Sequence, residues 1–224
     1  MPQIKIYHSS DEHGSYLPLA EFAEANGPPD LWILTGDFFP NMTRGDANQE
    51  IPYQIGYFQA SLPILKRAFK RVPILVQAGN HDYADLVSLL HKNLFDAYGV
   101  SETKSSITVG QDRIPVSYAG FRQIPYIAGE WNGETDYATL ASLVDKVVGE
   151  SPDLMINHAP PAGILDGEHY GIPALTSQLF YREHKIKAVL FGHVHRTSGA
   201  KVITVKDMVF SNAATTVQEV IVNF

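Results

Sequence analysis

The chain has 224 residues, a formal charge of −7 and no cysteine. Its length fits one large domain, and 45% hydrophobic with 18% charged residues is typical of a soluble globular protein. The lack of cysteine excludes disulfides, thiolate metal sites and cysteine nucleophiles, so any bound metal is held by nitrogen and oxygen.

In the first half of the chain, short apolar runs bounded by turn residues favour strands over residues 4–8, 31–34 and 72–76. Helical spacing predicts helices over residues 17–25, 53–70 and 84–98. Pro63 is expected to break, kink or restart the second of these helices, because proline removes a helical hydrogen bond.

In the second half, two runs flank a tight turn and predict antiparallel strands over residues 107–109 and 114–119. A helix is expected over residues 140–148, and strands over 153–157, 188–191, 201–205, 208–210 and 217–222. Early β-α-β units followed by antiparallel strands predict a layered α/β domain, with two sheets flanked by helices. No linker divides the chain, so we expect residues 1–224 to form a single domain.

The N-terminal residues lack the basic region and long apolar stretch of a signal peptide. No apolar run approaches the roughly 20 residues that a membrane-spanning helix needs. We therefore expect a cytoplasmic protein with no membrane partner.

Five short polar signatures occur in a fixed order, most of them directly after an apolar run. They are Asp11-Glu12-His13, Gly36-Asp37, Gly79-Asn80-His81-Asp82, Asn157-His158 and Gly192-His193-Val194-His195. Each signature alone is compatible with an ordinary turn. Five such signatures in sequence, each with a group that can bind metal, are not explained by turns alone. In extended backbone, residues i and i+2 point the same way, which would bring Asp11 and His13 together. Carboxylates, imidazoles and an amide at strand ends predict a site for a pair of metal ions.

The ordered signatures resemble the calcineurin-like metallophosphoesterases, over residues 4 to about 195. The resemblance implies a four-layer α-β-β-α sandwich of two mixed sheets flanked by helices, with the metal site at strand ends. It implies a first metal held by Asp11, His13, Asp37 and His195. It also implies that Asp37 bridges to a second metal, completed by Asn80, His158 and His193.

The resemblance places His81 beside the scissile phosphate rather than on a metal. A protonated His81 would donate a proton to the leaving alkoxide, and we expect Asp82 to orient its ring. Ligands without sulfur suit two divalent or mixed-valence ions of Mn, Fe or Zn. Such a pair, about 3.5–4 Å apart, would supply a hydroxide and hold the phosphoryl oxygens.

Residues 157–175 resemble small relatives of the class III cyclic-nucleotide phosphodiesterases. The predicted substrates are therefore small phosphodiesters, with cyclic nucleotides among them. Arg44 and Arg122, each near aromatic residues, are candidates to bind the phosphate. The alternative for each arginine is that its stem packs on surface aromatics.

Three other functions stay open. The same core would serve a phosphomonoesterase. A nuclease acting on extended nucleic acid would need a basic groove, which a charge of −7 does not indicate. A non-catalytic metal-binding scaffold would be expected to lose the ligands or His81, and all are present here. The sequence leaves the oligomeric state open.

Overall fold

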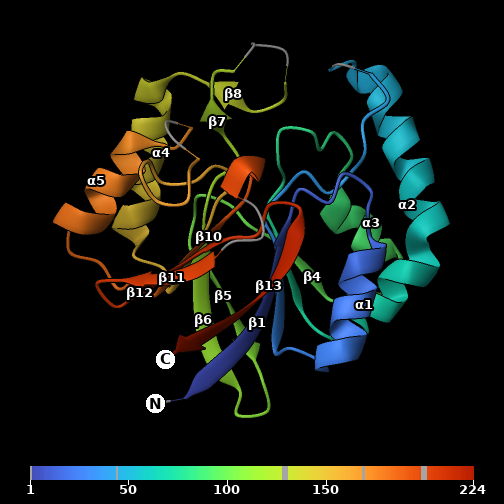
Figure 1. The fold of residues 1–224 in the computed structure, drawn as a ribbon, viewed down its shortest axis with the longest axis horizontal. Helices are drawn as coiled ribbons and strands as arrows, with labels where there is room; N and C mark the ends of the chain where they lie inside the picture. Colours follow the sequence, from blue (N-terminus) through green and yellow to red (C-terminus); the bar gives the residue numbers. More distant parts are fainter. Residues whose placement is uncertain (1, 44, 128–130, 168–169, 198–200) are drawn as a thin grey trace.

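The computed structural model describes residues 2–43, 45–127, 131–167, 170–197 and 201–224. Within these residues, two large β-sheets lie face to face, and a group of helices covers the outer face of each (Figure 1). The layers therefore follow the order α-β-β-α, which confirms the expected fold class.

The first sheet has the strand order β13-β1-β2-β3-β4. Its strands are β1 (Gln3–Ser10), β2 (Leu31–Leu34), β3 (Ile74–Val76), β4 (Ala97–Gly99) and β13 (Thr216–Asn223). Strands β1 to β4 are parallel, and β13 pairs with β1 in the antiparallel direction. All four residues of β2 are buried, as expected for a parallel strand that is covered on both faces.

The second sheet has the order β11-β12-β10-β9-β6-β5. Its strands are β5 (Ser105–Val109), β6 (Ile114–Ala119), β9 (Leu154–Ile156), β10 (Ala188–Phe191), β11 (Lys201–Val205) and β12 (Met208–Asn212). The four inner strands are parallel, whereas the edge strands β5 and β11 are antiparallel to their neighbours. A separate pair, β7 (Ile124–Pro125) and β8 (Glu134–Thr135), lies after β6 in the chain.

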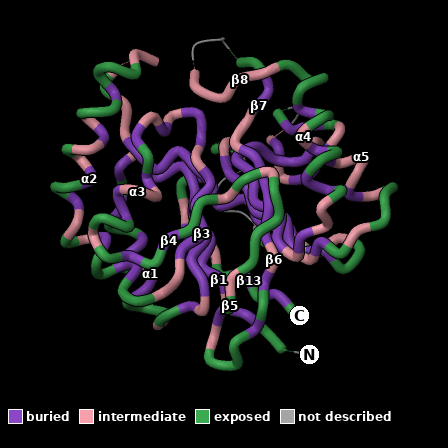
Figure 2. Tube along the Cα trace, turned by 180° about the vertical axis from the view of Figure 1, so that it is seen from behind, coloured by how far each residue is buried: buried purple, intermediate pink, exposed green. Residues whose placement is uncertain are grey.

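Helices α1 (Leu17–Asn26), α2 (Ala47–Phe69) and α3 (Leu86–Lys92) pack on the first sheet, and α4 (Tyr137–Glu150) and α5 (Pro173–Tyr181) on the second (Figure 1). A third apolar cluster, including Ile6, Val116 and Leu190, fills the space between the sheets. Figure 2 shows inner strands of both sheets, among them β1, β3 and β6, as mostly buried chain. The parallel strands are therefore packed on both faces, and this packing sets the positions of the loops at their ends.

Helix α2 continues through Pro52 and Pro63, so it is neither broken nor restarted at Pro63. A proline inside a helix costs about 3 kcal/mol. The buried side chains of Phe58, Leu65 and Phe69 offset this cost, because each contributes about 1.5–3 kcal/mol on burial.

One predicted helix is longer than the observed one, and one observed helix was not predicted. The helix predicted over residues 84–98 ends at Lys92, and β4 (Ala97–Gly99) follows it. Leu94, with φ of 66°, turns the chain between them. Helix α5 was not expected, although Pro173 occupies its first turn, where proline is favoured. None of the helices in the described ranges has the length and hydrophobicity of a membrane span.

Candidate metal centre

Each polar signature follows the carboxyl end of a parallel strand. Asp11 follows β1, Asp37 and Asn80 come after β2 and β3, and the remaining histidines come after β9 and β10. Backbone hydrogen bonds join these loops, from Asp11 N to Gly36 O at 2.8 Å and from Gly192 N to His158 O at 2.9 Å. The carboxyl ends of both sheets therefore meet at one edge of the sandwich.

Four of the predicted ligands have left-handed backbone. Asp11, His13, Asp37 and His193 have φ values of 58°, 44°, 54° and 68°. Asp11 and His13 do converge, but the reason we gave, extended backbone that points i and i+2 the same way, was wrong. Left-handed non-glycine residues are uncommon and cost free energy, and they occur preferentially at functional sites.

Two glycines allow these loops to approach each other. A Cβ added at Gly79 would lie 2.2 Å from Oδ1 of Asp37. One added at Gly192 would lie 2.3 Å from Oδ2 of Asp11. Glycine is therefore required at both positions for the carboxylates to keep their places.

The structure brings the predicted ligands together in three overlapping groups whose candidate donor atoms lie within 4.8 Å of one another. The groups are Asp11, His13 and His195; His13, Asp37 and His81; and Asp37, His158 and His193. Asp37 belongs to two groups, in agreement with a bridging position, and His13 also belongs to two. His81, which we expected not to bind metal, lies in one group as well.

Asp37 lies at the centre of the cluster. Its Oδ2 atom is 3.3 Å from Nε2 of His158, 3.8 Å from Nε2 of His81 and 4.0 Å from Nε2 of His13. Burial alone would raise the pKa of Asp37, but the facing imidazoles, His158 first, hold it below its ordinary value. Asp37 is therefore an ionised, buried carboxylate, which suits a cation.

His158 is completely buried and has both ring nitrogens engaged. Nδ1 lies 2.7 Å from the carbonyl oxygen of Thr35, and Nε2 lies 3.0 Å from Oδ1 of Asn80. Burial would lower the pKa of His158, but the Asp37 carboxylate outweighs it and raises this pKa. The neighbouring ring of His193 is 4.9 Å away, and burial lowers its pKa to about 4. This lowered pKa keeps His193 unprotonated at neutral pH, which is the form of imidazole that binds metal.

Asp11 forms the other end of the cluster. Its Oδ1 atom is 3.0 Å from Nε2 of His195, and its Oδ2 atom accepts the backbone N–H of His193 at 2.8 Å. The hydrogen bond with Asp11 raises the pKa of His195. Asp11 thus links the β1 loop of the first sheet to the β10 loop of the second.

His81 contacts two residues that the sequence did not assign to it. Its Nδ1 atom lies 2.5 Å from Oδ1 of Asn41, and its ring centroid is 4.0 Å from that of Trp131. Burial lowers the pKa of His81, and the Asp37 charge opposes this only in part. The contact expected from Asp82 is thus made by Asn41. The Asp82 carboxylate instead accepts backbone N–H groups of Phe39 and Gly79, at 3.0 and 2.8 Å.

A cavity of about 420 Å³ opens over the cluster. The predicted site residues that line it are His13, Asp37, Asn80, His81, His193 and His195. Its remaining walls come from Ile127, Trp131, Tyr170, Val194 and Arg196. Of these, Arg196 directly follows His195 in the sequence, and that adjacency was the only signal that could have identified it.

Of the two arginines predicted to bind substrate, the one that the structure describes does not line this cavity. Arg122 lines a different cavity of about 320 Å³, together with Tyr83 and Asp85. Arg44 lies outside the described residues.

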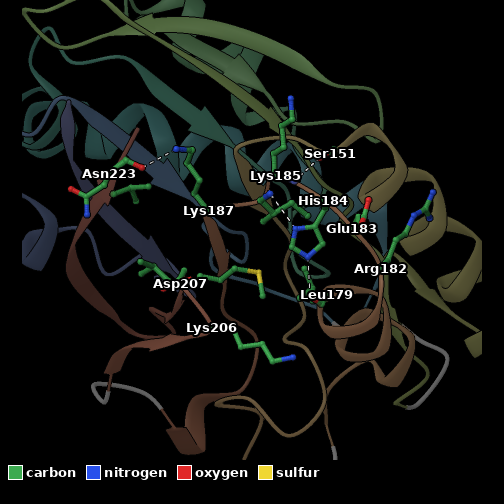
Figure 3. Close-up of a pocket in the computed structure, with 14 residues that line it drawn as sticks. Ser151, Leu179, Arg182, Glu183, His184, Lys185, Lys187, Lys206, Asp207 and Asn223 are labelled. Carbon is green, nitrogen blue, oxygen red and sulfur yellow. Dashed lines mark hydrogen bonds between the residues drawn. The ribbon is translucent and has the colours of Figure 1, made fainter. Parts of the chain in front are cut away.

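A larger cavity, of about 870 Å³, lies at the opposite, amino-terminal ends of β9, β10 and β12 (Figure 3). Its histidine, His184, accepts the N–H of Ile186 at Nδ1 and lies 2.9 Å from the Leu179 carbonyl through Nε2. Lys187 donates to the Asn223 carbonyl at 3.1 Å. The polar groups there serve the fold, whereas the metal-competent groups found in the described residues lie at the other edge.

The residues at that other edge fit a pair of metal ions. Two buried carboxylates, one buried amide oxygen and several imidazoles converge, and His158 is held by a backbone carbonyl as ligand histidines commonly are. These donors are all nitrogen and oxygen, in keeping with the lack of cysteine.

Comparisons with known proteins show the family of this chain and several proteins to which it is similar. A family model described as calcineurin-like phosphoesterase matches residues 4–197. The structure of TT1561 of Thermus thermophilus shares the fold, with a TM-score of 0.60 at 17% identity, covering 93% of this chain and 88% of that one. The calcineurin-like phosphoesterase YfkN of Bacillus subtilis gives a TM-score of 0.49 at 16% identity, covering 93% and 81%.

One curated relative is the probable rhamnogalacturonate lyase C of Emericella nidulans, 26% identical over 183 residues. The match covers 78% of this chain but only 16% of that protein, so the chain spans a small part of its length. The family model, by contrast, covers most of the chain and includes every signature of the site. The chain belongs to the calcineurin-like phosphoesterase family, whose activity is metal-dependent phosphoester hydrolysis.

Proposed function

We propose that this protein hydrolyses small phosphodiesters, cyclic nucleotides among them, with two ions of Mn, Fe or Zn. The observation that carries the proposal is the cavity of about 420 Å³ whose floor combines the candidate metal ligands with His81. This volume is near the lower end for ligand sites, so it suits a small ester rather than a polymer. The charge of −7 favours the same choice over a nuclease.

A metal pair in such a site lowers the pKa of bound water and neutralises charge on the phosphoryl oxygens. The residues of the chain supply the rest. Asp37, with three imidazoles around it, would hold the ions at the centre of the cavity, where their charge would meet the phosphoryl group. Asn41 keeps Nε2 of His81 directed toward Asp37 by contacting the opposite ring nitrogen.

In the proposed step the oxygen of water forms a bond to phosphorus, and the bond from phosphorus to the leaving oxygen breaks. The protonated form of His81 gives its Nε2 proton to the leaving oxygen, and the proton lost by water passes to solvent, from which His81 is reprotonated. The products are an alcohol and a phosphomonoester. No oxidant, reductant or second substrate is needed.

A phosphomonoesterase is the second candidate. Its substrate carries one more negative charge than a diester, and the Arg196 guanidinium on the cavity wall would meet that charge. The two candidates differ in the role of Arg196, which makes them separable by experiment.

The deciding experiment compares turnover of bis-p-nitrophenyl phosphate and p-nitrophenyl phosphate. Metal-stripped protein is resupplied separately with Mn, Fe(II), Zn, Ni and Mg, and His81→Ala and Asp37→Ala serve as inactive controls. Metal-dependent diester turnover that both variants lose supports the proposal. Faster monoester turnover selects the second candidate, and metal binding without turnover of either ester favours a scaffold.

A further inference from the structure

The cavity above the metal ligands has walls of two chemical kinds. Ile127, Trp131 and Tyr170 supply apolar and aromatic surface, whereas Arg196 supplies a guanidinium. The walls are therefore suited to two different substituents of one phosphate.

These two kinds of wall lie at different ends of a row of imidazoles. The ring of His13 lies 5.0 Å from that of His81 and 5.4 Å from that of His195. Among the described ring contacts, His81 reaches His195 only through His13. Trp131 packs against His81 at one end, and Arg196 follows His195 at the other.

The aromatic end is held in place by the backbone around Trp131. Nδ2 of Asn132 donates to the carbonyl oxygen of Asp82 at 3.2 Å, which ties this segment to the loop that carries His81. Gly133 accepts a hydrogen bond from Ile124 N at 3.0 Å. Trp131 is therefore positioned before a ligand arrives, and a preorganised ring loses little entropy on binding.

The cationic end is free to bind. Arg196 is exposed and lines the cavity, and within the described ranges its guanidinium has neither a hydrogen bond nor an ion pair. A guanidinium stays charged and binds carboxylate or phosphate through two parallel hydrogen bonds.

We propose that Trp131 and Arg196 select the substrate and decide which of its ester bonds breaks. The leaving alcohol carries a flat ring that stacks on Trp131, and the retained substituent carries a carboxylate or phosphate that pairs with Arg196. This inference rests on the proposed function, because it takes His81 as the proton donor to the leaving oxygen. A group attached to that oxygen lies beside the indole, which is 4.0 Å from the His81 ring.

The test uses three diesters on the metal-loaded protein. p-Nitrophenyl propyl phosphate and p-nitrophenyl 2-carboxyethyl phosphate share the leaving group and differ in the charge of the retained group. Trifluoroethyl propyl phosphate has an aliphatic leaving group and is followed by phosphorus NMR. The variants are Trp131→Leu and Arg196→Gln, with Tyr181→Leu and Arg182→Gln as controls, since Tyr181 is 89% exposed and Arg182 lines the distant cavity of Figure 3.

We expect Trp131→Leu to lower kcat/KM about five- to tenfold for both nitrophenyl esters and less than twofold for the trifluoroethyl ester. Arg196→Gln should remove a preference of about tenfold for the carboxyethyl over the propyl ester. The two control variants should behave like the unchanged protein.

A binding measurement tests the ring contact without turnover. The protein has two tryptophans, and Trp32 is completely buried, so a Trp32→Phe background reports on Trp131 alone. Phenylphosphonate should quench its fluorescence at lower concentration than methylphosphonate does.

Equal losses of Trp131→Leu on aryl and aliphatic leaving groups, with no quenching difference, would overturn the assignment of Trp131. An unchanged preference for the carboxyethyl over the propyl ester in Arg196→Gln would overturn the assignment of Arg196. If no diester is turned over by any metal form of the unchanged protein, the proposed function itself fails.

Discussion

The carbonyl oxygen of Thr35 fixes the ring of His158: Nδ1 lies 2.7 Å from it, so Nε2 is the nitrogen that faces Asp37. Thr35 is itself held, because its hydroxyl lies 3.0 Å from Nε2 of the buried His8. The other nitrogen of His8 lies 2.8 Å from the hydroxyl of Ser211 on the second sheet. The ligand geometry is thus supported by a polar bridge that crosses the space between the sheets.

Asp37→Asn should lower the metal content of the purified protein, since the carboxylate lies in two of the three donor groups. Loss of a residue that supports a metal ligand costs about 10–100-fold in affinity or activity, so loss of this ligand should cost more. Metal content by mass spectrometry and kcat for a nitrophenyl diester check this. An Asp37→Asn protein with two bound ions and normal turnover would contradict the central position of Asp37.

Asn41→Ala should lower kcat about tenfold while leaving metal content unchanged, because Asn41 contacts His81 and lies in none of the metal groups. Asn41→Asp retains an oxygen at the same place and should keep more of the activity. If Asn41→Ala loses metal instead, its role is in building the site rather than orienting the ring.

Asp82→Asn should reduce stability rather than act through His81, because both carboxylate oxygens accept backbone N–H groups. We expect a loss of about 1–3 kcal/mol in the free energy of unfolding, measured by urea denaturation. A selective fall in kcat with unchanged stability would instead restore the orienting role that the sequence suggested.

Gly79→Ala should abolish tight metal binding, because its Cβ would lie 2.2 Å from Oδ1 of Asp37. Gly56→Ala is the matched control, since a Cβ at this position in helix α2 meets nothing within 4 Å. The control should stabilise the helix by about 1 kcal/mol and leave metal titrations unchanged. Equal metal affinity in both variants would show that the loop can shift.

Glu12→Gln should stabilise the metal-free protein at neutral pH. Glu12 is 8% exposed, both its carboxylate oxygens lack a hydrogen-bond partner in the described structure, and burial raises its pKa from 4.5 to about 8. Because the folded-state pKa is raised, the contribution to stability is complete below pH 4.5 and is lost as the pH rises through about 8.

The unchanged protein should therefore lose on the order of a few kcal/mol relative to Glu12→Gln across this interval. Urea denaturation of metal-stripped protein from pH 4 to 9 measures the difference. Glu21→Gln, at an exposed position, is the control and should follow the unchanged protein. Parallel pH profiles for all three proteins would contradict the burial of a neutral carboxyl.

The sequence predicted best where the chain is buried on both faces. Strands β2 and β10 match the apolar runs over 31–34 and 188–191, because such short runs between turn residues leave little choice of structure. The sequence-based prediction failed at β4, because Phe95 and Ala97 fit a helical pattern. Only the pairing with β3 defines this strand, so a tertiary contact overrides the local preference for helix.

The site shows the same division. The ligand types could be read from their order along the chain, because each follows a strand end. The contacts of Asn41 and Trp131 with His81 could not, since they join residues 40 and 50 positions apart through the fold. The left-handed backbone at Asp11 and Asp37 could not be predicted either, because no side-chain pattern indicates it.

Because of that left-handed backbone, the free energy of unfolding is smaller than it would be with ordinary backbone conformations at the same positions. Each such non-glycine residue costs about 1–2 kcal/mol, and Asp11, His13, Asp37 and His193 are four of them. Glycine at these positions would relax the loops and remove the ligands together. In a lineage that gave up catalysis, mutation at these positions would be favoured first, because it would relieve the backbone cost without loss of a needed function.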